Sequence, residues 1–247
     1  MFSGKTKMAT ANKAKSKVIR AKANIKKIID RLDKVHSDAK LDLEFTNPLE
    51  LLIALILAAQ ARDDLVNQVT IELFKKYQTA EDYARAPLPA LQEQIRKINF
   101  YCNKAKSIHN CCSEIVARFG GKVPDRLDDL LSLPGVGRKT ANIVLGNAFG
   151  RHAIGVDTHV MRLSQRLKLT NNTNPDKIEF DLTSIVPEKQ RVRFCHLLQY
   201  HGRRVCLAKK PRCPECAIED LCPYREKEKS WLRRAKPFAL ISPEPVI

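Results

Sequence analysis

The sequence contains no apolar run long enough to cross a bilayer. In a chain of 247 residues the longest such run extends only from Leu51 to Ala59, whereas a transmembrane helix needs about 20 apolar residues. No secretory signal is recognisable, so we expect a reducing compartment without a disulfide framework. We therefore expect no membrane partner. The hydrophobic content of 44% is sufficient for a core in one large or two small domains.

Acidic residues are absent from the first part of the chain. The first is Asp30, and nine basic residues precede it. They are Lys5, Lys7, Lys13, Lys15, Lys17, Arg20, Lys22, Lys26 and Lys27. With a formal net charge of +17, the composition indicates a polyanionic partner. We interpret residues 1–22 as a basic disordered arm that strengthens sequence-independent binding to nucleic acid. An organelle-targeting peptide is the alternative, because the stretch is basic and acid-free, although it is poor in serine.

Strand-like alternation of apolar and polar residues does not persist along the chain, and nearly every segment has helical periodicity. The predicted fold class is therefore all-α. Asn47, Pro48 and Glu50 stand where an N-cap, a first-turn proline and an N3 glutamate begin a helix, and Thr79 with Asp82 predicts another start. Further helical segments are expected near residues 91–98, 103–119, 127–131, 158–167 and 175–185. Periodicity is lost after residue 228, so we expect a loose C-terminal tail over residues 229–247.

Four cysteines lie close together near the C-terminus. They are Cys206, Cys213, Cys216 and Cys222, in the spacing C-x6-C-x2-C-x5-C. A [4Fe–4S] cluster suits such spread ligands, whereas structural zinc sites usually have two short cysteine pairs. Spacing alone favours the cluster and leaves zinc, or no metal, as alternatives. The other four cysteines have apolar helical contexts and are expected to be small buried hydrophobic residues. They are Cys102, Cys111, Cys112 and Cys195.

Glycine is scarce, yet two of the nine glycines occur in one turn, Leu133-Pro134-Gly135-Val136-Gly137-Arg138-Lys139. A short helix enters this turn and a new helix begins near Arg138, which is the pattern of a helix–hairpin–helix. Exposed N–H groups at a turn and at a helix N-terminus bind anions, so Gly135, Val136, Gly137 and Arg138 are candidate contacts to a DNA phosphate.

Lys139 stands at the positive end of a helix dipole, where cations are disfavoured. One interpretation is a lysine that contacts phosphate. The other is an amine whose neutral form the site favours, so that it attacks C1′ of a damaged nucleoside and forms a Schiff base. The latter chemistry needs a carboxylate, and Asp157 is the candidate. Its alternative role is that of an ordinary N-cap, and the two roles are compatible.

The hairpin, the segment of residues 155–157 and the cysteine loop occur in an order that resembles endonuclease III. That family comprises bifunctional DNA glycosylases for pyrimidine damage within the helix–hairpin–helix, Gly/Pro…Asp superfamily. The resemblance covers about residues 40–226. It implies two α-helical domains that flank a DNA cleft: a six-helix barrel domain at 41–151 and a discontinuous iron–sulfur domain at 23–40 and 152–228.

The resemblance also implies roles for individual residues. Lys139 matches the Schiff-base nucleophile, Asp157 the catalytic aspartate, and the four loop cysteines the ligands of a [4Fe–4S] cluster. Gln60 and Phe100 match the residues that fill the gap left by a flipped base, and His159 is placed at the pocket. Further DNA contacts are expected from the cysteine loop, at Lys209, Lys210 and Arg212. Two departures are Asn99, where relatives usually have glycine, and Arg62, where threonine is common.

The implied enzyme excises oxidised pyrimidines from double-stranded DNA and cleaves the abasic site by β-elimination. We expect a monomer in a bacterial cytoplasm, associated with the nucleoid, or in a nucleus or organelle of a eukaryote. Two alternatives stay open: a non-catalytic iron–sulfur module that binds DNA, and an adenine-mismatch glycosylase. The second is disfavoured because such relatives lack a lysine at position 139 and use a glutamate on the central helix, near Ile56.

Overall fold

The computed structural model describes residues 24–224. The predicted basic arm at 1–22 and the predicted tail at 229–247 lie outside the described residues. Between residues 24 and 224 all regular elements are helical, which confirms the prediction of an all-α fold. None of the described helices has the length and apolar character needed to cross a membrane.

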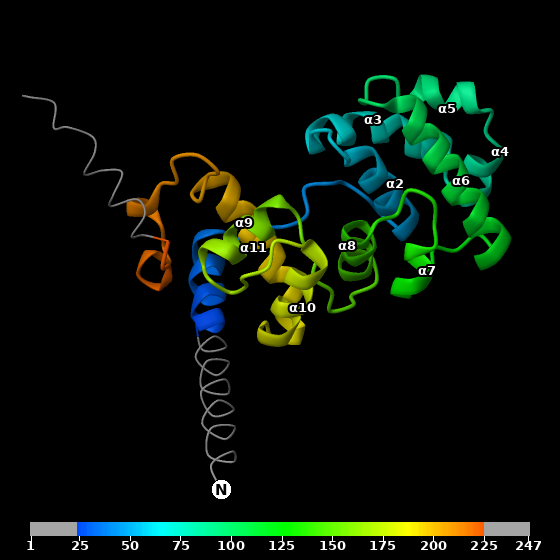
Figure 1. The fold of residues 1–247 in the computed structure, drawn as a ribbon. Helices are drawn as coiled ribbons and strands as arrows, with labels where there is room; N and C mark the ends of the chain where they lie inside the picture. Colours follow the sequence, from blue (N-terminus) through cyan, green and yellow to red (C-terminus); the bar gives the residue numbers. More distant parts are fainter. Residues whose placement is uncertain (1–23, 225–247) are drawn as a thin grey trace, which may run out of the picture.

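The first of two lobes is built around one apolar helix (Figure 1). Its elements are α2 (Pro48–Ala58), α3 (Asp63–Lys76), α4 (Ala80–Arg85), α5 (Leu88–Gln94), α6 (Tyr101–Phe119), α7 (Leu127–Leu131) and α8 (Arg138–Ala148). Helix α2 has buried residues on every side, as expected for a helix at the centre of a helical core. The predicted caps are confirmed: Asn47 Oδ1 accepts from the Glu50 N–H at 3.0 Å, and Thr79 forms a capping box with Asp82.

The second lobe combines the N-terminal helix with the C-terminal half of the chain. Its elements are the helical residues 24–35, α9 (Thr158–Arg166), α10 (Pro175–Ile185), η1 (Glu188–Gln190), α11 (Arg191–Arg204), η2 (Cys213–Glu215) and η3 (Glu219–Leu221). Their apolar side chains form a second buried cluster, separate from that around α2. The cysteine loop lies beside the N-terminal helix (Figure 1), where Arg31 donates a hydrogen bond to the Ala217 carbonyl at 3.4 Å.

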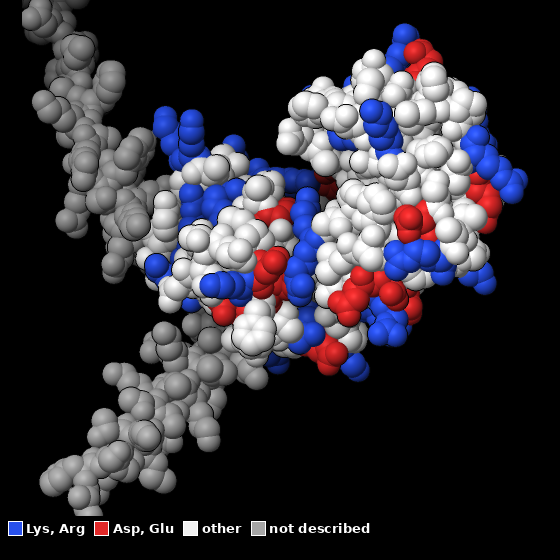
Figure 2. Space-filling view, turned by 45° about the vertical axis from the view of Figure 1, so that its right-hand side comes forward, with Lys and Arg blue, Asp and Glu red and all other residues white. Residues whose placement is uncertain are grey.

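The two lobes approach each other closely at α8. A Cβ built on Gly155 would stand 2.8 Å from Ile143 Cγ1 and 3.8 Å from the Lys139 carbonyl oxygen. Because a real Cβ does not approach a side-chain carbon to 2.8 Å, glycine at this position permits the contact. Lysine and arginine side chains gather on the surface along the boundary between the lobes (Figure 2).

Helix α6 differs from its prediction at the N-terminus. It begins at Tyr101 rather than Asn103, after Phe100 in the left-handed conformation. The prediction that all four remaining cysteines are buried is wrong for Cys102, which is exposed; Cys111, Cys112 and Cys195 are buried. The early start places Cys102 in the first turn of α6, beside the exposed Tyr101.

Candidate nucleic-acid interface and metal centre

The hairpin between α7 and α8 presents backbone donors at its tip. Gly135 has φ +79°, a left-handed conformation that glycine adopts without strain. The Val136 side chain is buried and its N–H donates to the Leu133 carbonyl at 3.2 Å, which holds the turn in place. Gly137 is the N-cap of α8 and has no side chain to accept from the first N–H groups of the helix. This uncapped N-terminus is a suitable place for an anion.

Lys139 lies in the first turn of α8, with its side chain exposed. Because Gly155 packs against Ile143, the segment before α9 lies against the backbone of Lys139. Asp157 follows two residues later, so a primary amine and a carboxylate approach the same boundary between the lobes from α8 and α9.

Asp157 is the N-cap of α9 and is largely buried, with 13% of its side chain exposed. Its Oδ1 accepts from the Val160 N–H at 2.7 Å, and its Oδ2 lies 3.5 Å from His159 Nδ1. Burial alone would raise the pKa of this carboxyl. The interactions with His159 and the Val160 N–H and the charge of Lys139 outweigh burial, so the pKa lies below its usual value. Asp157 is therefore ionised at neutral pH, and it has the cap role as well.

Arg138 is held by a carboxylate of the other lobe. Its Nε and Nη2 donate to Glu179 of α10 at 2.7 and 3.0 Å, and Asn142 Nδ2 donates to the same carboxylate at 2.8 Å. This pairing raises the pKa of the Arg138 guanidinium. The Arg138 side chain thus has a protein partner, and the contact of the hairpin N–H groups with a phosphate stays a prediction. Sequence reasoning missed Glu179, and its only signal was a glutamate beside the inward-facing Ile178.

Gln60 and Phe100 lie in exposed turns at the ends of two neighbouring helices. Gln60 follows α2 with φ 57°, and Phe100 precedes α6 with φ 60°. Phe100 is 62% exposed, so it is not part of the hydrophobic core. Left-handed backbone is uncommon for residues with a side chain and costs roughly 1–3 kcal/mol, and such strain often marks functional sites. Of the two departures from the family pattern, Asn99 is exposed and Arg62 forms an exposed ion pair with Asp64.

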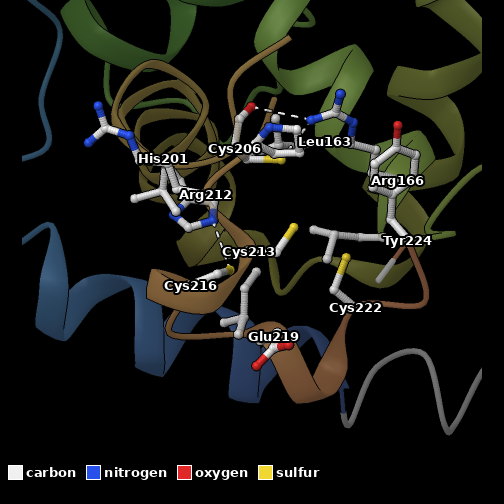
Figure 3. Close-up of a pocket in the computed structure, with 14 residues that line it drawn as sticks. Leu163, Arg166, His201, Cys206, Arg212, Cys213, Cys216, Glu219, Cys222 and Tyr224 are labelled. Carbon is white, nitrogen blue, oxygen red and sulfur yellow. Dashed lines mark hydrogen bonds between the residues drawn. The ribbon is translucent and has the colours of Figure 1, made fainter. Parts of the chain in front are cut away.

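The four loop cysteines surround one space in the second lobe (Figure 3). The space has a volume of about 450 Å³, part of it open to solvent, and its other walls are largely apolar. Polar side chains approach the sulfurs: Arg166 Nη1 lies 3.2 Å from Cys206 Sγ, and His201 Nε2 lies 3.3 Å from Cys216 Sγ. Behind His201, its Nδ1 meets His36 Nε2 at 3.1 Å.

The donor set suits a centre larger than one ion. Between residues 24 and 224 no three histidine, cysteine or acidic side chains already stand close enough to hold a single metal ion. Four soft sulfur donors that line one apolar space without converging on a single point match a cluster better than one tetrahedral zinc with ligands at about 2.3 Å. Burial, together with Cys206 and Cys222, raises the pKa of the Cys216 thiol to about 11. Loading of a metal centre must therefore release the proton from Cys216.

Helix α9 connects the cysteine loop with Asp157. Arg162 Nη2 donates to the Gly202 and Cys206 carbonyls at 3.0 and 3.1 Å, and Arg166 donates to the Leu207 carbonyl at 2.8 Å. The same helix carries Asp157 at its N-cap. An ordered loop thus fixes the helix that positions this carboxylate.

The basic residues of the cysteine loop face solvent. Lys209, Lys210 and Arg212 are all exposed. The backbone of Arg212 is tied to the end of α11, because its N–H donates to the Val205 carbonyl at 2.9 Å. The loop therefore holds its cations at the surface.

The sequence is similar to those of known DNA repair proteins. Residues 53–188 match the family described as HhH-GPD superfamily base excision DNA repair protein. Endonuclease III of Synechocystis sp. is 47% identical over 193 residues, which cover 78% of this chain and 88% of the relative. Endonuclease III of Escherichia coli K12 is 40% identical over 206 residues, which cover 83% of this chain and 98% of the relative.

The fold is also similar to those of solved DNA repair proteins. A trapped endonuclease III–DNA covalent intermediate is similar with a TM-score of 0.79 at 42% identity, covering 84% of this chain and 98% of that one. A thermostable thymine-DNA glycosylase is similar with a TM-score of 0.75 at 26% identity, covering 83% of this chain and 98% of that one.

Proposed function

Because the chain belongs to the HhH-GPD superfamily of base excision DNA repair proteins and groups with endonuclease III, we propose how its residues carry out the reaction. The protein is a DNA glycosylase and abasic-site lyase of base excision repair. We assign its substrate as duplex DNA that contains an oxidised pyrimidine or an abasic site. We assign the acting species as a monomer in a bacterial cytoplasm, in keeping with the bacterial relatives.

Lys139 is the proposed nucleophile. Its neutral amine attacks C1′ of the extruded nucleotide, the new N–C1′ bond forms, and the C1′–base bond breaks. The departing base takes the bonding electrons and a proton. The nitrogen gives up one proton. The C1′–O4′ bond of the sugar ring then breaks, O4′ takes the bonding electrons and a proton from solvent, and the nitrogen lone pair forms the C1′=N bond of a protonated Schiff base. Loss of a C2′ proton then expels the 3′ phosphate by β-elimination.

Asp157 is the proposed partner of Lys139. As a carboxylate it stabilises the positive charge that develops on the sugar when the base departs, and it accepts a proton from the attacking amine. Its low pKa keeps it ionised for both tasks. His159, 3.5 Å away, sustains that state from the same helix turn.

Gln60 and Phe100 are the proposed gap-filling residues. Extrusion of a nucleotide leaves an unstacked space in the duplex, and exposed side chains at turn tips are able to enter it. The N-terminus of α8, with Gly135, Val136 and Gly137, grips a backbone phosphate beside the lesion.

A [4Fe–4S] cluster is the proposed occupant of the cysteine site, held by Cys206, Cys213, Cys216 and Cys222. When bound, the cluster would crosslink the loop. The reaction at the sugar would not involve it. The chain's own residues then use the ordered loop in two ways. Lys209, Lys210 and Arg212 meet phosphates, and Arg162 and Arg166 hold α9 in place.

One observation carries the proposal: Lys139 lies exposed at the uncapped N-terminus of α8, and Gly155, two residues before the N-cap Asp157, packs against the α8 backbone, so that the amine and the carboxylate lie at the same boundary between the lobes. The test is borohydride trapping with duplex DNA that contains one abasic site or one thymine glycol. The parent protein and Lys177→Gln, an exposed-lysine control, form a covalent adduct. Lys139→Gln binds the same duplex but forms none. An equal adduct from Lys139→Gln would overturn the assignment of Lys139 as the nucleophile. No adduct from the parent protein would leave a non-catalytic DNA-binding module as the correct function.

A further inference from the structure

Lys104 is a buried lysine that the reaction does not use. Helical spacing places it on the inner face of α6 with Ile108, Cys111 and Ile115, and only 7% of the residue is exposed. Its Nζ donates to the Leu57 carbonyl at 2.8 Å and to the Ala59 carbonyl at 2.7 Å. Burial lowers the pKa of this ammonium group, so the site bears a cost that the two hydrogen bonds offset.

The two carbonyls belong to the end of α2. The last carbonyls of a helix have no partner within the helix and carry partial negative charge. Helix α2 has no basic residue in its own last turn, and its C-cap Ala59 has left the helical conformation, with ψ 112°. Lys104 therefore supplies from α6 the cation that the end of α2 lacks.

The bridge joins the two exposed turns that carry the proposed gap-filling residues. Gln60 directly follows Ala59, and Phe100 lies one helical turn before Lys104, whose N–H donates to the Phe100 carbonyl at 3.0 Å. Both turn residues have positive φ, 57° at Gln60 and 60° at Phe100. A strained backbone persists only where neighbouring structure holds it. Lys104 is the side chain that reaches from one of these turns to the other.

We propose that Lys104 is a positioning residue for damage recognition: it fixes the end of α2 against the start of α6 and so holds Gln60 and Phe100 ready to fill the gap beside an extruded nucleotide. The inference rests on the proposed function, because it assumes that these two residues enter the duplex. It assigns Lys104 no contact with DNA and no part in the chemistry.

The test measures discrimination rather than catalysis. Dissociation constants are measured for two duplexes of one sequence, one undamaged and one with a tetrahydrofuran abasic analogue. Lys104→Met keeps the apolar stem and removes the ammonium. We expect its preference for the abasic duplex to fall about tenfold, which corresponds to about 1.4 kcal/mol, with affinity for the undamaged duplex unchanged. Lys106→Met removes an exposed charge from the same helix and should leave the preference intact.

A cycle with Gln60→Ala separates positioning from general loss of structure. In the Gln60→Ala background, Lys104→Met should produce a smaller loss of preference than in the parent, because the part of its effect that passes through Gln60 is already gone. An equal loss in both backgrounds, or an unchanged preference in Lys104→Met, would overturn the proposal. If Lys104→Met does not fold, Lys104→Gln gives the same comparison with a smaller expected loss, and a preference equal to the parent's would again be contrary. Trapping by the parent protein tests the proposed function separately.

Discussion

Removal of the Glu179 carboxylate should loosen the helix that carries Lys139. Glu179 is 14% exposed at its side chain and receives two hydrogen bonds from Arg138 and one from Asn142. Glu179→Gln keeps the shape and removes the charge. The Arg138 guanidinium, 39% exposed, would then remain partly buried beside a neutral amide.

The magnitude follows from this partial burial. Breaking a fully buried ion pair costs roughly 3–5 kcal/mol, and an exposed pair contributes about 0–1 kcal/mol. An intermediate pair with a buried carboxylate and a half-exposed guanidinium should therefore contribute about 2 kcal/mol. For a chain of this size that predicts a fall in melting temperature of about 4–8 °C.

Thermal unfolding followed by circular dichroism measures the effect, with the exposed Glu188→Gln as the matched control. Trapping on an abasic duplex under single-turnover conditions should also slow for Glu179→Gln, because the first turn of α8 positions the amine. Equal melting temperatures for the two variants would refute the claim that the hydrogen bonds of Glu179 to Arg138 and Asn142 stabilise α8. A loss of stability with an unchanged trapping rate would show that the ion pair between Glu179 and Arg138 does not position Lys139.

Three further outcomes are expected. Asp157→Asn keeps a good helix N-cap but loses the charge, so single-turnover cleavage should slow about a hundredfold or more while DNA binding and melting temperature stay near the parent values. His159→Ala removes interactions that lower the Asp157 pKa and leaves the burial that raises it, so Asp157 should protonate at a higher pH than in the parent, and the activity deficit should grow as pH falls. A rate ratio independent of pH would contradict this. Changing Lys209 and Lys210 together to glutamine should weaken binding to all sequences and reduce the slope of log K against log salt by about 2, and an unchanged slope would exclude both as phosphate contacts.

Local signals made much of the helical framework predictable. The N-cap at Asn47 and the capping box at Thr79 depend on side chains within four residues of each other, so the sequence contains all the information needed. Helical periodicity likewise predicted the segments that form α6 and α10. Gly135 was assigned to a turn that requires its conformational freedom, and its φ of +79° agrees.

The start of α6 was not predictable in the same way. Phe100 adopts a left-handed conformation that a phenylalanine does not favour. As the N-cap residue it has no side chain that could cap the helix, so the sequence contains no local signal for the start of α6. The structure around the turn holds that conformation against local preference. Cys102, which was expected to be buried, lies in the first turn of this helix and is exposed.

Contacts between residues far apart in the sequence could not be predicted either. Arg138 and Glu179 are 41 positions apart, and Lys104 is 47 positions from Leu57. The hairpin pattern predicted a phosphate contact at Arg138 from its position in the turn, but it did not reveal the carboxylate that the side chain meets. Lys104 interrupted an otherwise apolar stripe, but only the structure shows which carbonyls it meets.

The most direct test of the central claim is to locate the covalent bond. After borohydride trapping of the parent protein on an abasic duplex, the adduct is digested and the modified peptide sequenced by mass spectrometry. A sugar remnant on the Lys139 side chain is the predicted result. A remnant on Lys209, on Lys210 or on the N-terminal amine, with Lys139 unmodified, would contradict the account.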